Sequence, residues 1–173
     1  MFGSLKTFIA SLVNDAGLEN RFENKDCWVA TAALLIRVAS VDGELSEAKR
    51  GKPHAVLKSN LGLDDLTSLQ LVDDAVTADR GAIDLYHFTR QLNDVLDDEG
   101  RRRVVKMMWE VAYVDESMNE VASNIIWRVA DLLGVPSRQR NELRQRVALS
   151  RTIRAEQANY KSVGISAPSC STN

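Results

Sequence analysis

The sequence lacks most of the features that would place it in a specialised class of protein. Its 173 residues include two cysteines, Cys27 in an apolar stretch and Cys170 in a Ser-rich one, so neither a disulfide framework nor a zinc-ligand spacing is present. No apolar run is long enough to span a membrane, and no secretory leader is recognisable. We therefore expect a protein of a reducing compartment, located in the cytoplasm.

Two further absences limit the function. The formal net charge is -2, so the molecule as a whole offers no global attraction to nucleic acid or anionic lipid. Ser, Cys, His and Lys occur without the paired spacing that would indicate a nucleophile and its base. We predict that the chain is not an enzyme.

What the sequence does contain is helical periodicity from end to end, with no segment of convincing strand alternation. It predicts an all-α fold, a single bundle of seven to eight helices with an internal pseudo-twofold repeat. We expect three parts: residues 1–24 form an amphipathic helix and a connection, residues 25–154 the helical domain, and residues 155–173 a disordered tail.

The first helix has two interpretations. Phe2, Leu5, Phe8 and Ile9 recur at helical spacing, which favours a helix that packs on the bundle. The alternative is an interfacial helix on a membrane, but that class usually has a strongly basic polar face, and Lys6 is the only basic residue before Arg21.

Residues 27–41 are apolar almost all round, as expected for a central, buried helix. In the helix that follows, Pro53 has no backbone N–H to donate, and its ring clashes with the carbonyl one turn back. That helix is therefore either kinked near residue 50 or restarts with Pro53 in its first turn. The last helix is expected from Pro136 to about Arg154.

A repeated acidic turn organises the chain. Residues 39–47 read ASVDGELSE and residues 112–120 read AYVDESMNE, each following a strongly apolar helical run. Ser46 and Asn119 are predicted helix N-caps, and Gly134 is predicted to end the helix after the second turn. Two such hairpins, about seventy residues apart, indicate an internal duplication.

These residues resemble the TerB-like family, best known from tellurite-resistance gene clusters. The resemblance rests on VASVDGELS at 38–46, DLYHFT at 84–89, the acidic turn at Asp115 and ADLLGV at 130–135, and it covers roughly residues 27–150. It implies a helical bundle with an acidic, metal-binding surface in a protein of the stress response. The chain departs from the pattern at Lys49 and Ala122, where the family usually has glutamates, and at Glu116, which replaces a glycine.

The two turns supply hard oxygen donors that suit calcium or magnesium. The candidate metal ligands are Asp42, Glu44, Glu47, Asp115, Glu116 and Glu120. The helix dipole alone also favours acidic residues at helix N-termini, so a structural role is the competing interpretation. With Lys49 in the first copy, any divalent cation should bind weakly.

Charge is unevenly distributed along the chain. Acidic residues dominate from Asp64 to Glu99, and arginines dominate from Arg128 to Arg154. These segments are either solvated helix faces, facing one another within the bundle, or a surface for an acidic partner or nucleic acid. The candidate basic residues are Arg138, Arg140, Arg144 and Arg146. Aromatic residues for base stacking are missing there, which disfavours nucleic acid.

The function expected from these features is a non-catalytic TerB-like binding or scaffold protein, responsive to divalent metal, with protein partners. The alternative is an adaptor that contacts a membrane surface or nucleic acid through the first helix or the arginine-rich last one. The sequence does not indicate an oligomeric state.

Overall fold

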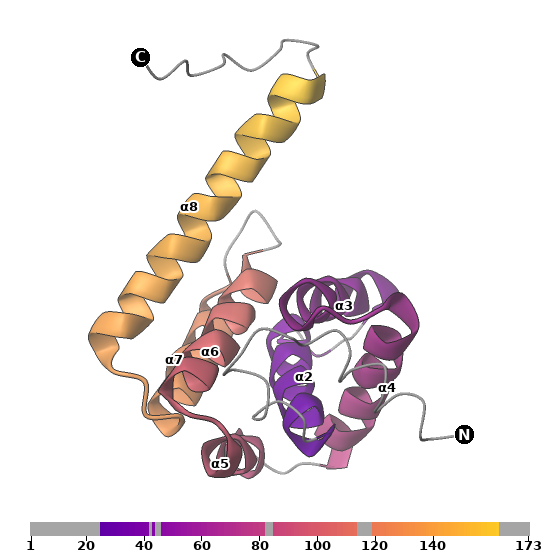
Figure 1. Ribbon diagram of the computed structural model, residues 1–173, viewed down its shortest axis with the longest axis vertical. Helices are drawn as coiled ribbons and strands as arrows, with labels where there is room; N and C mark the ends of the chain where they lie inside the picture. The colour runs from indigo at the N-terminus through magenta and orange to yellow at the C-terminus, as the bar shows by residue number, and fades with distance from the viewer. Residues whose placement is uncertain (1–24, 42, 44–45, 82–84, 114–118, 163–173) are drawn as a thin grey trace.

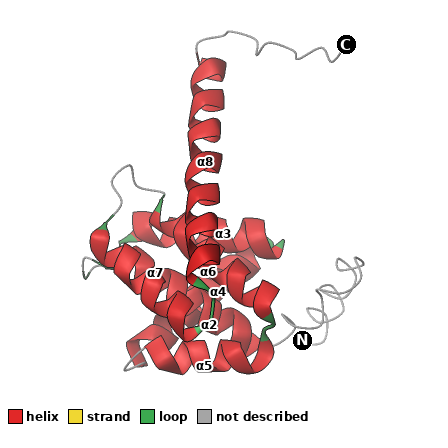
Figure 2. Cartoon of the chain, turned by 90° about the vertical axis from the view of Figure 1, so that its left-hand side faces the viewer, coloured by secondary structure: helices red, strands yellow, loops and turns green. Residues whose placement is uncertain are grey.

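A computed structural model describes residues 25–41, 43, 46–81, 85–113 and 119–162, and these residues form a bundle of seven helices without a strand (Figures 1 and 2). The all-α prediction is confirmed. The helix predicted within residues 1–16 lies outside the described residues. In chain order the helices are α2 (Lys25–Ala39), α3 (Glu47–Leu61), α4 (Asp65–Gly81), α5 (Leu85–Val95), α6 (Asp98–Ala112), α7 (Glu120–Leu132) and α8 (Ser137–Ser162).

Helix α2 is the centre of the bundle, as its apolar sequence predicted. It packs against α3, α4, α5, α6 and α7. Ala30, Ala33, Leu34 and Leu35 are completely buried. The small alanines let neighbouring backbones approach closely, while the leucines fill the space between them.

The predicted caps on α3 and α7 are present. The Ser46 side chain accepts a hydrogen bond from the Lys49 amide, and the Asn119 side chain accepts one from the Val121 amide at 2.8 Å. At the other end of α7, Gly134 has φ +71° and donates to the carbonyl of Asp131. Gly134 therefore follows the cap residue in a left-handed turn that satisfies the end of the helix.

Helix α6 begins at Asp98, directly after an aspartate cap. The Asp97 carboxylate accepts a hydrogen bond from the Gly100 amide at 2.9 Å. An aspartate before the first turn satisfies amides that the helix itself leaves open.

Helix α3 continues through its proline. It runs without interruption from Glu47 to Leu61, so of the two alternatives the restart at Pro53 is wrong, and a single helix remains. The ring removes one intrahelical hydrogen bond, but Pro53, Val56 and Leu57 are all buried. Packing of this face against the bundle compensates for the lost bond.

Helix α8 is longer than predicted. We expected its end near Arg154, but it extends to Ser162, so residues 155–162 are helical. Its first half packs on α6, with Leu143 and Val147 buried. The rest projects beyond the bundle, and the side chains of Leu149 and Ile153 are 63% and 45% exposed (Figures 1 and 2).

Two helical glycines should respond oppositely to the same substitution. A Cβ at Gly51 meets nothing within 4 Å, so Gly51→Ala should raise the free energy of unfolding by about 0.5–1 kcal/mol through lower unfolded-state entropy. A Cβ at Gly100 lies 3.0 Å from the Leu96 Cδ2, and Leu96 is buried. Gly100→Ala should therefore destabilise by about 1 kcal/mol or more. Urea unfolding of both variants measures the pair, and stabilisation by both would contradict the packing at Gly100.

Candidate functional site

The predicted metal ligands divide into two groups. Asp42, Glu44, Asp115 and Glu116 lie outside the described residues. Glu47 and Glu120 are exposed in the first turns of α3 and α7, where the helix dipole favours them. Among the residues that the structure describes, no three His, Cys, Asp or Glu side chains are grouped so that they could hold a metal. The shared metal site stays a prediction.

The four candidate arginines of α8 do not form one surface. Arg140 and Arg144 lie against the aromatic side chains of α6 and α7. The Arg140 guanidinium lies 6.0 Å from the Trp127 ring centre, and that of Arg144 lies 5.5 Å from the Trp109 ring centre. These two arginines therefore attach α8 to the bundle.

Hydrogen bonds complete this attachment. Arg140 donates to the Val135 carbonyl at 2.5 Å and to the Asp131 carboxylate at 2.8 Å. Arg144 donates to the Tyr113 hydroxyl at 3.2 Å. By contrast, Arg138 is an exposed residue that pairs with Glu142 one turn along the same helix. Of the four, only Arg146 reaches a groove.

Most of the acidic segment pairs with helices other than α8. The carboxylates of α4 form ion pairs with α2 and α3. The pairs are Asp65–Lys58 (2.6 Å), Asp73–Arg50 (3.1 Å), Asp74–Lys25 (3.2 Å) and Asp79–Arg37 (2.7 Å). For α4, the expectation that the acidic segment faces the arginine-rich helix is wrong, whereas Glu99 at the end of that segment does lie beside α8.

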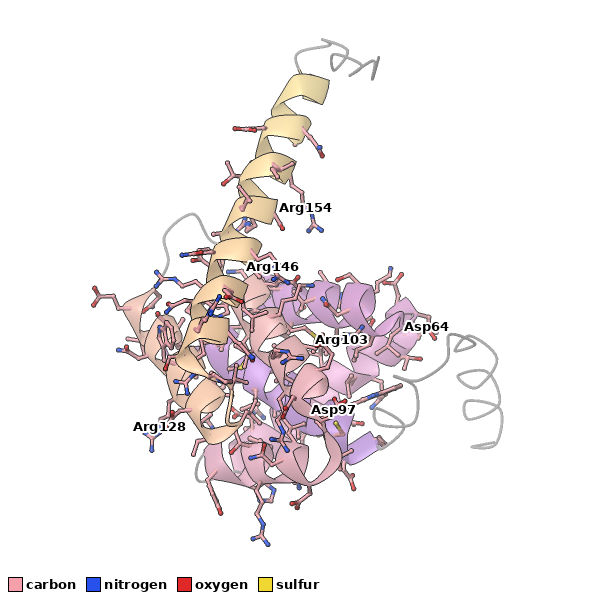
Figure 3. All side chains as sticks on the ribbon, turned by 60° about the vertical axis from the view of Figure 1, so that its left-hand side comes forward. Asp64, Asp97, Arg103, Arg128, Arg146 and Arg154 are labelled. Atoms are coloured by element: carbon pink, nitrogen blue, oxygen red, sulfur yellow. The ribbon has the colours of Figure 1, made fainter. Side chains whose placement is uncertain are left out.

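Two adjacent carboxyls at the start of α4, those of Asp64 and Asp65, have a pKa below the usual range. A hydrogen bond from Lys58 lowers the pKa of Asp65, and the Thr67 amide lowers that of Asp64 at the start of α4 (Figure 3). A lowered carboxyl pKa adds stability above the unfolded-state pKa, and this stability is lost as the pH falls through the folded-state pKa. Both carboxylates therefore serve the local structure.

A hollow with a cavity volume of about 860 Å³ lies between α3, α6 and α8. A second hollow of about 460 Å³ continues it between α6 and α8. Lys106 and Arg146 line both, so the two form one groove along α8. We call this the α8 groove, and its basic residues are Lys52, Arg102, Arg103, Lys106, Arg146, Arg151 and Arg154.

Comparison with protein-family models gives one match. The model of the tellurite resistance protein TerB covers residues 28–145, more than half of the chain. The chain belongs to the TerB family. No curated protein and no solved structure matches the chain significantly. The family match includes α2 to α7 and the first third of α8, so the projecting part of this TerB helix lies beyond it.

The sequence did not reveal the α8 groove. Lys52, Lys106 and Arg154 come from three helices, and helical spacing gives no signal for residues that meet only in the folded bundle. One signal was present within α8: the buried Leu143 and Val147 are followed by Arg151 and Arg154 at the same three- to four-residue spacing. The bundle-facing side of this TerB helix thus changes from apolar to basic.

None of the described helices has both the length and the apolar composition needed to cross a bilayer.

The division among the arginines predicts unequal mutational effects. Arg140→Ala and Arg144→Ala should each lower the free energy of unfolding by about 1–2 kcal/mol, because each loses hydrogen bonds and contact with an aromatic ring. Arg138→Ala should change it by about 0.5 kcal/mol or less, since its ion pair is exposed. Chemical denaturation compares the three variants. Equal effects would contradict the assignment of Arg140 and Arg144 to α8 attachment.

Cys27 should be inert in the folded protein. Burial raises the pKa of its thiol to about 11, so about one molecule in a thousand is a thiolate at pH 8. In a Cys170→Ser variant, maleimide labelling monitored by mass spectrometry should be very slow in buffer and fast in urea. Fast labelling in buffer would show that the start of α2 is open.

Proposed function

We propose that this chain is a non-catalytic binding protein of the TerB family that acts as a scaffold in tellurite resistance or a general stress response. The family to which it belongs carries tellurite resistance in its description. The observation that carries the binding role is the α8 groove, which is open, basic and bounded by a helix that projects beyond the bundle. Such a surface suits the capture of another macromolecule.

The second part of the proposal is a response to divalent cations at the acidic turns. The helices that lead into these turns, α2 and α6, pack against each other, which supports two turns acting together. Carboxylate oxygens at Asp42 and Asp115 are the donors that calcium and magnesium prefer. The basic residue at Lys49 should keep the affinity low, with a dissociation constant of about 10⁻⁴ to 10⁻³ M.

Metal titration tests the cation response. Amide NMR spectra of the chain with calcium, magnesium and zinc should show saturable shifts confined to residues 42–47 and 115–120. Asp42→Asn and Asp115→Asn should each abolish the shifts in both turns if the site is shared, while Asp94→Asn, on the exposed side of α5, should leave them unchanged. An unchanged spectrum at millimolar metal would overturn the cation response.

The scaffold role has its own test. Immobilised protein should retain a defined partner from a lysate of its host, identified by mass spectrometry and then confirmed with the purified components. A chain that binds neither divalent ions nor any confirmed partner is not a binding protein of this kind.

A further inference from the structure

The α8 groove has the length of a peptide site. The residues of α8 that line it run from Gln139 to Ala155, and at 1.5 Å per residue this distance is about 24 Å. A small anion would occupy a fraction of that length, whereas a helix of about sixteen residues would fill it. The shape therefore favours a polypeptide over a free phosphate or carboxylate.

The acidic residues of the groove are already paired. One carboxylate oxygen of Glu110 lies 3.2 Å from the Lys106 ammonium nitrogen. The other oxygen accepts a hydrogen bond from the Asn60 side-chain amide at 2.7 Å. Glu99 pairs with Arg102 at 2.6 Å, and Glu142 pairs with Arg138 outside the groove. Each of these three carboxylates is therefore already paired with a cation.

Two cations of α8 lack a counter-charge. The side chains of Arg146 and Arg154 are exposed, and neither guanidinium has an ion-pair or hydrogen-bond partner among the described residues. Figure 3 shows both along the same side of α8, with Arg103 below them on α6 and Arg128 apart from them at the lower left. Positive charge along one open groove attracts an acidic ligand and raises the rate at which that ligand associates with the protein.

The walls of the groove between these cations are small or apolar. Helix α3 contributes Ala48, Gly51 and Ala55 along one face, and α8 contributes Val147 and Ala155. Small side chains allow another helix to approach closely, and the apolar atoms give it area to bury. Aromatic side chains on which bases could stack are absent from the described lining, which disfavours single-stranded nucleic acid.

We propose that the α8 groove binds an acidic amphipathic helix of a partner protein, with its apolar side against Ala55 and Ala155 and its carboxylates on Arg146 and Arg154. This inference rests on the scaffold role proposed above and names the partner's chemistry. The projecting half of α8 forms one wall of the site, and α3 forms the other. The arrangement is a helix held in a groove by flanking charge.

The test is fluorescence anisotropy of a labelled helical peptide of about sixteen residues with Glu and Leu at alternating three- and four-residue spacing. Wild-type protein should bind it saturably at low salt, and binding should weaken as salt rises. Arg146→Glu/Arg154→Glu should weaken binding by about tenfold or more. The matched control is Arg90→Glu/Arg128→Glu, which makes the same change in net charge at exposed positions of α5 and α7 outside the groove and should have little effect.

Amide shifts give a second readout on the wild-type protein. Peptide-induced shifts should fall on α3, on the Lys106 region of α6 and on the second half of α8. Absence of saturable binding, equal weakening by the two double variants, or shifts elsewhere would each overturn the proposal. Tighter binding to phosphatidylglycerol vesicles or to a thymidine oligonucleotide, lost in Arg146→Glu/Arg154→Glu, would also overturn it, because the groove would then take another class of ligand.

The outcome separates this proposal from the scaffold role. If Arg146→Glu/Arg154→Glu still retains a confirmed partner as the wild type does, the scaffold role stands and the groove assignment is wrong. If the wild type retains no partner and no metal, the scaffold role itself fails. Circular dichroism checks that both double variants remain folded, which is expected because all four arginines have exposed side chains.

Discussion

The whole bundle depends on one constraint: α2 has no polar face to present to water. A helix that is apolar all round must be covered on every side, and five other helices pack around it. Each fully buried Leu or Ile contributes about 1.5–3 kcal/mol relative to exposure, so any neighbour that withdrew from α2 would leave a costly apolar surface. The order of the bundle follows from this requirement.

Coverage of α2 also fixes the position of the candidate site. One of the helices that cover α2 is α6, whose side chains Val105, Met108 and Trp109 are buried. Trp109 lies edge-on to Trp127 of α7, with ring centres 6.1 Å apart. The Arg144 guanidinium of α8 lies over the Trp109 ring. The central helix therefore positions α6, the aromatic pair positions α8, and α8 with α3 encloses the groove.

Local features of the fold were predictable from sequence because they are decided within a few residues. Ser46, Asn119 and Gly134 act at the ends of their own helices, and the burial of α2 follows from its composition. The sequence left two alternatives for Pro53, because the choice between a continuous and a restarted helix depends on tertiary packing, and the structure has the continuous one. The length of α8 was underestimated although Ala155, Gln157 and Ala158 are good helix formers.

The site was less predictable because it depends on which helices meet. Arg140 and Arg146 are the same residue type on the same helix, yet one attaches α8 to the bundle and the other lines the groove. The two arginines point in different directions around the axis of α8. Which direction meets the bundle and which meets the groove depends on where α6 packs. The acidic turns, in contrast, were visible as a repeat, and their role as a metal site stays a prediction.

The change from Val147 to Arg151 along the inner side of α8 has a consequence for the energetics of that helix. Its first half is held by the bundle, whereas its second half relies on its own hydrogen bonds and helix propensity, which are marginal for a short isolated segment. Backbone amides there should exchange with solvent by local fraying, at a free-energy cost well below that of global unfolding. Any ligand that needs this wall must first order it, so substitutions at outward positions such as Thr152 can tune affinity without touching the ligand.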